Sequence, residues 1–201
     1  MLTLYYTPNT ISVAVAITLE HLQHPYDAVK VDFALGEQRQ PDYQKINPKG
    51  RVPALVTAAG VLTETGALLE YVAPQLVPED PFAAARMREL MSYLNGTMHP
   101  HHAHGLRGER WADEETSFAD MKRKVPQTMA ACCAHLEDVL ADLPFQLGQM
   151  QVLSDPYLYI VLTWLAGDGV DIAHFPRLQA FQQAMDTLPA VKAVRDKGML
   201  S

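Results

Sequence analysis

The chain has 201 residues, 48% of them hydrophobic and 19% charged, which is typical of a folded protein with a sizeable core and excludes a disordered one. Its 16 basic and 23 acidic residues give a formal charge of −7, which argues against a partner that is a nucleic acid or an anionic membrane. At ~150 residues per domain, this length allows one large domain or two small ones. We expect a cytoplasmic protein, since no signal-peptide pattern opens the chain, its most apolar run (157–166) is too short to span a bilayer, and it has only 2 cysteines.

The first part of the chain is predicted to alternate strands and helices in the order βαβ, then ββα. The pattern gives a strand at 2–6, a helix from Ser12, a strand at 26–33, a hairpin at 53–63 and a helix around 68–76. Residues 1–77 are therefore expected to form a small α/β domain.

The rest of the chain is predicted to be helical. Two prolines and two acids at 78–82 mark a linker, and 83–201 form an all-helical domain. Its expected helices cover about 83–99, 113–143 with a bend at Pro126, a buried helix opening at Ser154, 175–185 and 189–197. Ser154 or Asp155 is expected to cap the buried helix.

Two short motifs carry a resemblance to a known family. Residues 47–55 read Asn-Pro-Lys-Gly-Arg-Val-Pro-Ala-Leu, and 62–65 read Leu-Thr-Glu-Thr. These motifs resemble those of the glutathione transferase family, and residues 4–8, Leu-Tyr-Tyr-Thr-Pro, resemble its bacterial members, including the beta class. The resemblance implies a thioredoxin-like N-terminal domain that binds glutathione and a helical domain that lines the pocket for an electrophile.

The resemblance also implies which residues hold glutathione. Val52, before a cis Pro53, would pair with the extended tripeptide through its N–H and C=O. Thr65, where a helix begins, would hold the γ-glutamyl carboxylate, and Glu64 would pair with the ligand amine. Without the resemblance, the same residues are equally well explained as a hairpin turn and a capped helix.

The residue that activates the thiol is left open among three candidates. Beta-class members carry a cysteine three residues after the proline of the first loop, and here that position is Ile11, which puts mixed-disulfide chemistry in doubt. Ser12 and Thr10 are the leading candidates, with Tyr6 behind them as a pocket residue. A hydroxyl at these positions would lower the thiol pKa by hydrogen bonding, although Thr10 and Ser12 could instead cap the first helix.

Four histidines lie within residues 99–104, followed by arginines and Trp111. We expect no metal site, because Pro100 interrupts the helix and no cysteine or close carboxylate completes a ligand set. His99 and Trp111 are expected to line the second-substrate pocket. Arg107 and Arg110 either offer cations to an acidic co-substrate or form a structural Arg–Glu cluster.

Two further groups of side chains have unremarkable explanations. Cys132 and Cys133 lie on an apolar helix stretch and are expected to be small buried hydrophobes. Apolar residues on the first long helix are a weak sign of a dimer interface, although they could equally be core; they are Met87, Leu90, Met91 and Leu94.

The leading hypothesis is an enzyme of detoxification that binds glutathione as a thiolate and adds it to a small hydrophobic electrophile. The resemblance also implies a twofold homodimer. The alternatives are a binding protein of the same fold without the chemistry, or a glutathione-dependent peroxidase, dehalogenase or isomerase. No segment of the sequence predicts the second substrate.

Overall fold

A computed structural model describes residues 1–201. The N-terminal half contains β1 (Leu2–Tyr6), α1 (Ser12–His21), β2 (Tyr26–Lys30), α2 (Pro41–Ile46), β3 (Ala54–Thr57), β4 (Gly60–Thr63) and α3 (Thr65–Val72). The helical half contains α4 (Pro81–Tyr93), α5 (His99–His104), α6 (Glu115–Ala141), α7 (Ser154–Thr163), α8 (Pro176–Asp186) and α9 (Pro189–Asp196). The predicted order, a thioredoxin-like unit followed by helices, is confirmed.

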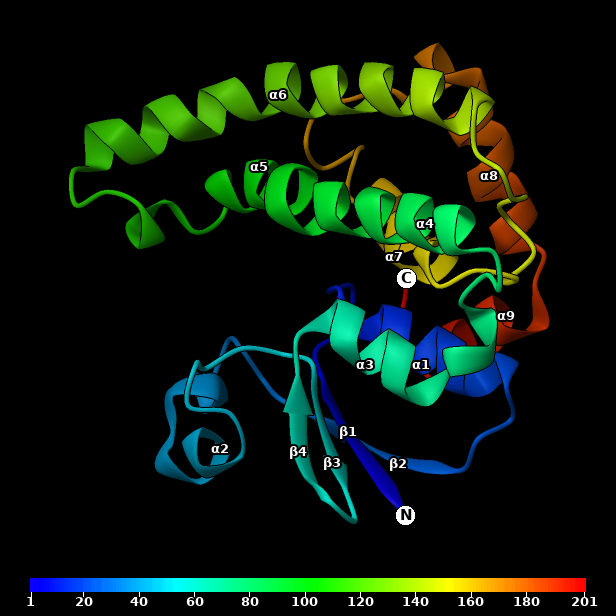
Figure 1. Ribbon diagram of the computed structural model, residues 1–201. Coiled ribbons are helices and arrows are strands. Elements are labelled where there is room, and N and C mark those ends of the chain that lie inside the picture. The colour runs from blue at the N-terminus through cyan, green and yellow to red at the C-terminus, as the bar shows by residue number, and fades with distance from the viewer.

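The four strands form one mixed sheet in the order β2-β1-β3-β4. β1 pairs parallel with β2 and antiparallel with β3, and β3 pairs antiparallel with β4. Figure 1 shows α1 and α3 on the side of the sheet that faces the helical half, with α2 away from both. β2 ends at Lys30 rather than at Phe33, because the Asp32 carboxylate accepts the N–H groups of Ala34 and Leu35 and turns the chain.

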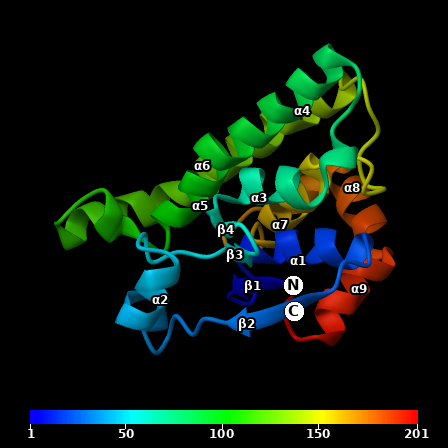
Figure 2. The same ribbon diagram turned by 60° about the horizontal axis from the view of Figure 1, so that its bottom comes forward.

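Helix α1 is enclosed on all sides. Every residue from Ser12 to Leu19 is buried, and the helix packs against α3, α7 and α9 (Figure 2). A helix that is apolar all round is stable only in the interior of a protein. α1 therefore joins the two halves into one core.

The helical half begins at Pro81, where the Asp80 side chain caps α4 by accepting the Ala83 N–H at 2.8 Å. α7 is buried along its length, as predicted, and no helix is both long and apolar enough to cross a membrane. The expected helix cap at its start is wrong: Ser154 Oγ has no partner, and Asp155 accepts the Met150 N–H of the preceding loop at 2.8 Å.

The expectation that Pro100 interrupts the long helix is also wrong. A π-helical segment, Leu94–Met98, follows α4, and α5 continues from it with Pro100 in its first turn. The π turn changes the hydrogen-bond register, with the His99 N–H donating to Leu94 O, and so accommodates the following proline, which has no N–H to donate. The apolar side chains of α4 and the π segment point into the chain's own core; they are Met87, Leu90, Met91 and Leu94.

Candidate functional site

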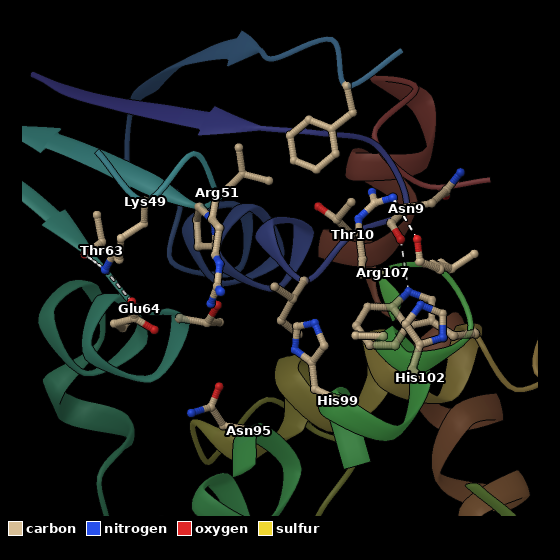
Figure 3. Close-up of a pocket in the computed structure, with 18 of the residues that line it drawn as sticks. Asn9, Thr10, Lys49, Arg51, Thr63, Glu64, Asn95, His99, His102 and Arg107 are labelled. Carbon is tan, nitrogen blue, oxygen red and sulfur yellow. Dashed lines mark hydrogen bonds and ion pairs between the residues drawn. The ribbon is translucent and has the colours of Figure 1, made fainter. Parts of the chain in front are cut away.

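A cleft of about 230 Å³ lies between the two halves of the chain. The N-terminal half contributes the loop after β1, the segment before β3 and the start of α3. The helical half contributes α5 and its flanking residues, with two side chains of the α7 region, Tyr157 and Trp164. Figure 3 shows these side chains converging from both halves.

Of the three candidates for thiol activation, Thr10 lines the cleft. Its Oγ1 donates to Thr7 O at 2.8 Å and lies 2.7 Å from Ser12 Oγ. Ser12 is fully buried behind it and accepts the Thr7 N–H at 3.1 Å. Tyr6 does not line the cleft: it lies on the same face of β1 as Leu4, which points into the core, because alternate strand residues share a face.

Asn9 holds the loop that carries Thr10 against the helical half. Its N–H donates to Met199 O at 3.0 Å, and its carbonyl accepts Trp164 Nε1–H at 2.9 Å. Its side-chain oxygen accepts both the N–H and the hydroxyl of Ser201. Its φ of 58° is left-handed, a conformation that asparagine tolerates better than most residues.

The segment before β3 presents free backbone groups to the cleft. The Val52–Pro53 bond is cis, and neither the N–H nor the C=O of Val52 has a hydrogen-bond partner in the chain. Tyr43 and Asn47 each donate to Arg51 O at 2.6 Å and fix the turn. An extended peptide could therefore pair with Val52 without displacing an internal bond.

Glu64 and Thr65 lie where β4 gives way to α3. Glu64 has a left-handed φ of 71°, a strained conformation for a residue other than glycine that is found most often at functional sites. Its carboxylate is ion-paired with Lys49, whose Nζ also donates to Thr63 Oγ1 at 2.7 Å. Thr65 opens α3 and lines the cleft, so the positive end of this helix lies at the cleft wall.

His99 lines the cleft, as expected. Its Nδ1 lies 3.2 Å from Tyr157 Oη, which in turn donates to Asn95 Oδ1 at 3.2 Å. Because the Tyr157 proton is used on Asn95, His99 Nδ1 is the donor to Tyr157, and Nε2 is left as an acceptor. Burial, helped by the positive charges of His102, Arg110 and Arg51, lowers the His99 pKa to about 4.

His102 was not predicted as a cleft residue. Its Nδ1 lies 2.9 Å from both carboxylate oxygens of the buried Asp168, and its ring stacks on Trp164 with 4.3 Å between centroids. The stacked His102 ring orients Trp164, whose Nε1–H donates to Asn9 O and so holds the loop that carries Thr10. His102 and Asp168 lie more than 60 residues apart in the sequence, so no local sequence pattern predicts their contact.

Trp111 does not line the cleft, contrary to expectation. It is 48% exposed and packs edge-on against His104, 4.5 Å between centroids, on the outer side of α5. No group of three or more His, Cys, Asp or Glu side chains is placed to hold a metal ion. His101 instead lies 3.3 Å from Cys132 Sγ, and both cysteines are buried, as expected.

The fold and the cleft define a class: two-domain proteins in which a thioredoxin-like domain and a helical domain share a cleft beside a cis-proline loop. Residues 1–74 match the family model described as "Glutathione S-transferase, N-terminal domain". A solved glutathione transferase homologue from Sulfitobacter, with bound glutathione, is 55% identical, with a TM-score of 0.95 and coverage of 100% of this chain and 99% of that one. The chain belongs to the glutathione S-transferase family.

More distant relatives agree with this assignment. A beta-class glutathione S-transferase structure from Sphingomonas chungbukensis is 28% identical, with a TM-score of 0.82 and coverage of 98% of this chain and 99% of that one. A glutathione S-transferase of Xanthomonas campestris is 28% identical, and the match covers 90% of this chain and 91% of that protein. A maleylacetoacetate isomerase of Pseudomonas aeruginosa is 29% identical, and the match covers 94% of this chain and 92% of that one.

Proposed function

We propose that the cleft binds glutathione and adds its thiolate to an electrophile. The Sulfitobacter structure holds glutathione, and the cleft here offers the groups that such a tripeptide needs. The free N–H and C=O of Val52 would pair with the cysteinyl backbone beside Pro53. The N-terminus of α3 at Thr65 would hold the γ-glutamyl carboxylate, and Glu64 would share its charge between Lys49 and the ligand amine.

The observation that carries this proposal is the position of the Thr10 hydroxyl, in the cleft at the N-terminal end of α1. Ser12 Oγ accepts the Thr7 N–H, and its own proton has two acceptors within reach, Thr7 O at 3.2 Å and Thr10 Oγ1 at 2.7 Å. In the arrangement proposed here, Ser12 donates to Thr10 Oγ1. Thr10 can then turn its proton from Thr7 O toward the sulfur of glutathione. A hydrogen bond to the thiolate stabilises the charged form and lowers the thiol pKa, with help from the positive end of α1. Ser12 acts here as a positioning residue.

The reaction itself is a displacement or an addition at carbon. With an alkyl or aryl halide, the thiolate sulfur forms a bond to carbon, and the carbon–halogen bond breaks with its electron pair leaving on the halide. The second substrate would lie beyond Thr10, against apolar side chains that include Ile11, Phe33 and Leu106. The neutral His99 would accept a hydrogen bond there, and Trp164 would close the far side.

Cellular location, biological role and oligomeric state are also proposed. We propose a cytoplasmic enzyme of detoxification, a setting supported by two reduced, buried cysteines. We also propose a homodimer, supported by two large hydrophobic side chains left exposed on neighbouring surface helices, Tyr71 of α3 at 50% and Phe82 of α4 at 69%.

Substitution of Thr10 tests the proposed function. Thr10→Val keeps the shape of the side chain and removes the hydroxyl, and a hydrogen bond to a charged group contributes about 1.5–3 kcal/mol. We expect kcat/KM with an aryl halide to fall about 10- to 100-fold, and the pKa of bound glutathione, read from thiolate absorbance, to rise by about 1–2 units.

Two matched variants make the result interpretable. Thr10→Ser keeps the hydroxyl and is expected to keep most of the activity. Ser12→Ala removes the hydroxyl behind Thr10 and is expected to lower kcat/KM a few-fold. If Thr10→Val bound glutathione with the wild-type thiol pKa and turned over at the wild-type rate, the role of Thr10 would be excluded.

A further inference from the structure

Four arginines surround the part of the cleft next to Phe33. Arg51, Arg107 and Arg110 line both the cleft and an adjoining recess, and Arg39 lines the recess. No carboxylate lies within ion-pair distance of any of the four, so they do not form the structural Arg–Glu cluster that was the alternative expectation.

The charges around these cavities are strongly unbalanced. Basic residues exceed acidic ones by five to two, in a chain whose formal charge is −7. Of the two acidic residues, Glu64 is already ion-paired with Lys49. Glu109 is therefore the one acidic side chain left to offset the charge of the four arginines. Burial lowers the pKa of Arg110, and the nearby charges of Arg51, Arg107 and Arg39 lower it further, against the opposing effect of Glu109. An anion placed among them would relieve this repulsion.

Glutathione does not account for all four arginines. Its γ-glutamyl carboxylate is assigned above to the start of α3, so one carboxylate, that of the glycine end, remains. Arg51 precedes Val52, and Arg39 lies on the same half of the protein, so this pair is placed for the glycine carboxylate. Arg107 and Arg110 come from the helical half, beyond α5, and need a different anion.

The position of Arg107 indicates what kind of molecule carries that anion. Its guanidinium carbon lies 5.9 Å from the centre of the Phe33 ring, and the neighbouring cleft side chains Ile11 and Leu106 are apolar. The site thus combines an apolar floor with the guanidinium groups of Arg107 and Arg110 at its edge. Figure 3 labels Arg107 close to Thr10 on this side of the cleft. Guanidinium groups bind planar carboxylates through paired hydrogen bonds.

We propose that the electrophilic substrate carries a carboxylate, bound by Arg107 and Arg110, with its reactive carbon held over the apolar floor toward Thr10. This inference rests on the proposed function and replaces its neutral hydrophobic electrophile with an acidic one. The covalent step is unchanged: sulfur bonds to carbon, and the leaving group departs with its electron pair.

A matched pair of substrates tests the proposal. 4-(Chloromethyl)benzoate and its methyl ester share one reactive carbon and differ in charge, and each rate is divided by the uncatalysed rate with glutathione. We expect the wild-type protein to prefer the carboxylate by about 10-fold or more, since a charge-assisted hydrogen bond contributes about 1.5–3 kcal/mol. Arg107→Gln and Arg110→Gln should each lose about 10-fold on the carboxylate and stay within about 2-fold on the ester.

Control variants separate charge from folding. Arg123→Gln removes an exposed arginine of α6 that does not line the cleft, and should leave both rates unchanged. Arg110→Lys keeps a positive charge and should recover part of the loss. Glutathione affinity should be the same in all variants; weaker glutathione binding with equal losses on both substrates would assign the arginines to glutathione and overturn the proposal.

A binding experiment keeps this proposal separable from the proposed function. Calorimetry with 4-methylbenzoate and 4-methylbenzamide, in saturating S-methylglutathione, requires no turnover. If the wild-type protein turns over neither chloride yet binds the carboxylate more tightly than the amide, and Arg110→Gln loses that preference, the transferase proposal fails and the acidic site stands. Equal binding of the two probes, or none, would overturn the acidic site whatever the activity.

Discussion

At the residue scale, His99 supplies the cleft with an uncharged hydrogen-bond acceptor. It lies among positive charges, and burial keeps it uncharged, with a pKa of about 4. Its Nδ1–H is used on Tyr157, so its Nε2 is an acceptor in a cleft otherwise rich in cationic donors. Such an acceptor can receive a hydrogen bond from a neutral group of the ligand without adding positive charge.

The lowered pKa predicts how stability depends on pH. Between pH 6.5 and about 4, an unfolded chain takes up a proton on His99 that the folded protein does not, so the free energy of unfolding falls as the pH falls through this window. At about 1.36 kcal/mol per pKa unit, the loss is on the order of 3 kcal/mol. Urea unfolding of wild type and His99→Phe across this range should show a steeper fall for wild type; parallel curves would contradict the prediction.

The sequence predicts those cleft residues that lie together in a short sequence motif. Val52, Pro53, Glu64 and Thr65 belong to two short motifs, and the structure places all of them on the cleft. The helical half could not be assigned in the same way. His102 is held by a tertiary contact with the buried Asp168, and Trp164 stacks on the His102 ring, and their neighbours in sequence carry no sign of either contact.

At the scale of elements, the loop between β1 and α1 is anchored to the helical half. Asn9 is bonded through its N–H, its carbonyl and its side chain to residues that follow α7 or α9. The left-handed backbone at Asn9 is therefore maintained by the helical half. This anchoring holds Thr10 from the side of the helical half, and its hydroxyl is bonded on the other side to Thr7 O, directly after β1.

Substitution of Asn9 separates the side chain from the backbone conformation. Asn9→Gly loses the bonds to Ser201 but accepts a φ of 58°, whereas Asn9→Ala loses the same bonds and adds a Cβ that the left-handed region disfavours by roughly 1–2 kcal/mol. We expect the Ala variant to be less stable than the Gly variant by about 1 kcal/mol in urea unfolding. Equal stabilities would show that the loop relaxes out of the left-handed region.

Most elements follow from hydrophobic periodicity, and the exceptions have local causes. β2 stops early because Asp32 starts a turn, and α5 runs through Pro100 because a π segment precedes it. Neither cause is visible in the spacing of apolar residues. Trp111 is placed by a contact that the spacing does not show either: Arg107 and Arg110 line the cleft, whereas Trp111 packs edge-on against His104 of α5.

At the scale of the whole molecule, the positive cleft contrasts with the negative chain around it. A localised positive field draws anions to the cleft while the net charge keeps the protein dispersed. Association of acidic ligands should therefore slow as salt is added, because the field is screened within about 8 Å at physiological ionic strength.

The exposed hydrophobic side chains of α3 and α4 predict self-association. In a twofold dimer, both copies of Phe82 would be buried, at roughly 1.5–3 kcal/mol per copy. We expect sedimentation to report twice the 22.3 kDa mass of the chain, and Phe82→Ser to shift the protein toward monomer. A wild-type protein that sediments as a monomer at all concentrations would rule out the dimer.

The enclosure of α1 has a consequence for how the protein is made. α1 emerges from the ribosome early, whereas α7 and α9, which cover part of it, are synthesised far later. Through most of translation the nascent N-terminal half exposes the part of α1 that α7 and α9 later cover, and its folding cannot be completed before α9 emerges. Chaperones that bind apolar segments should therefore associate with the growing chain during this interval, and synonymous changes in translation speed should alter the yield of folded protein.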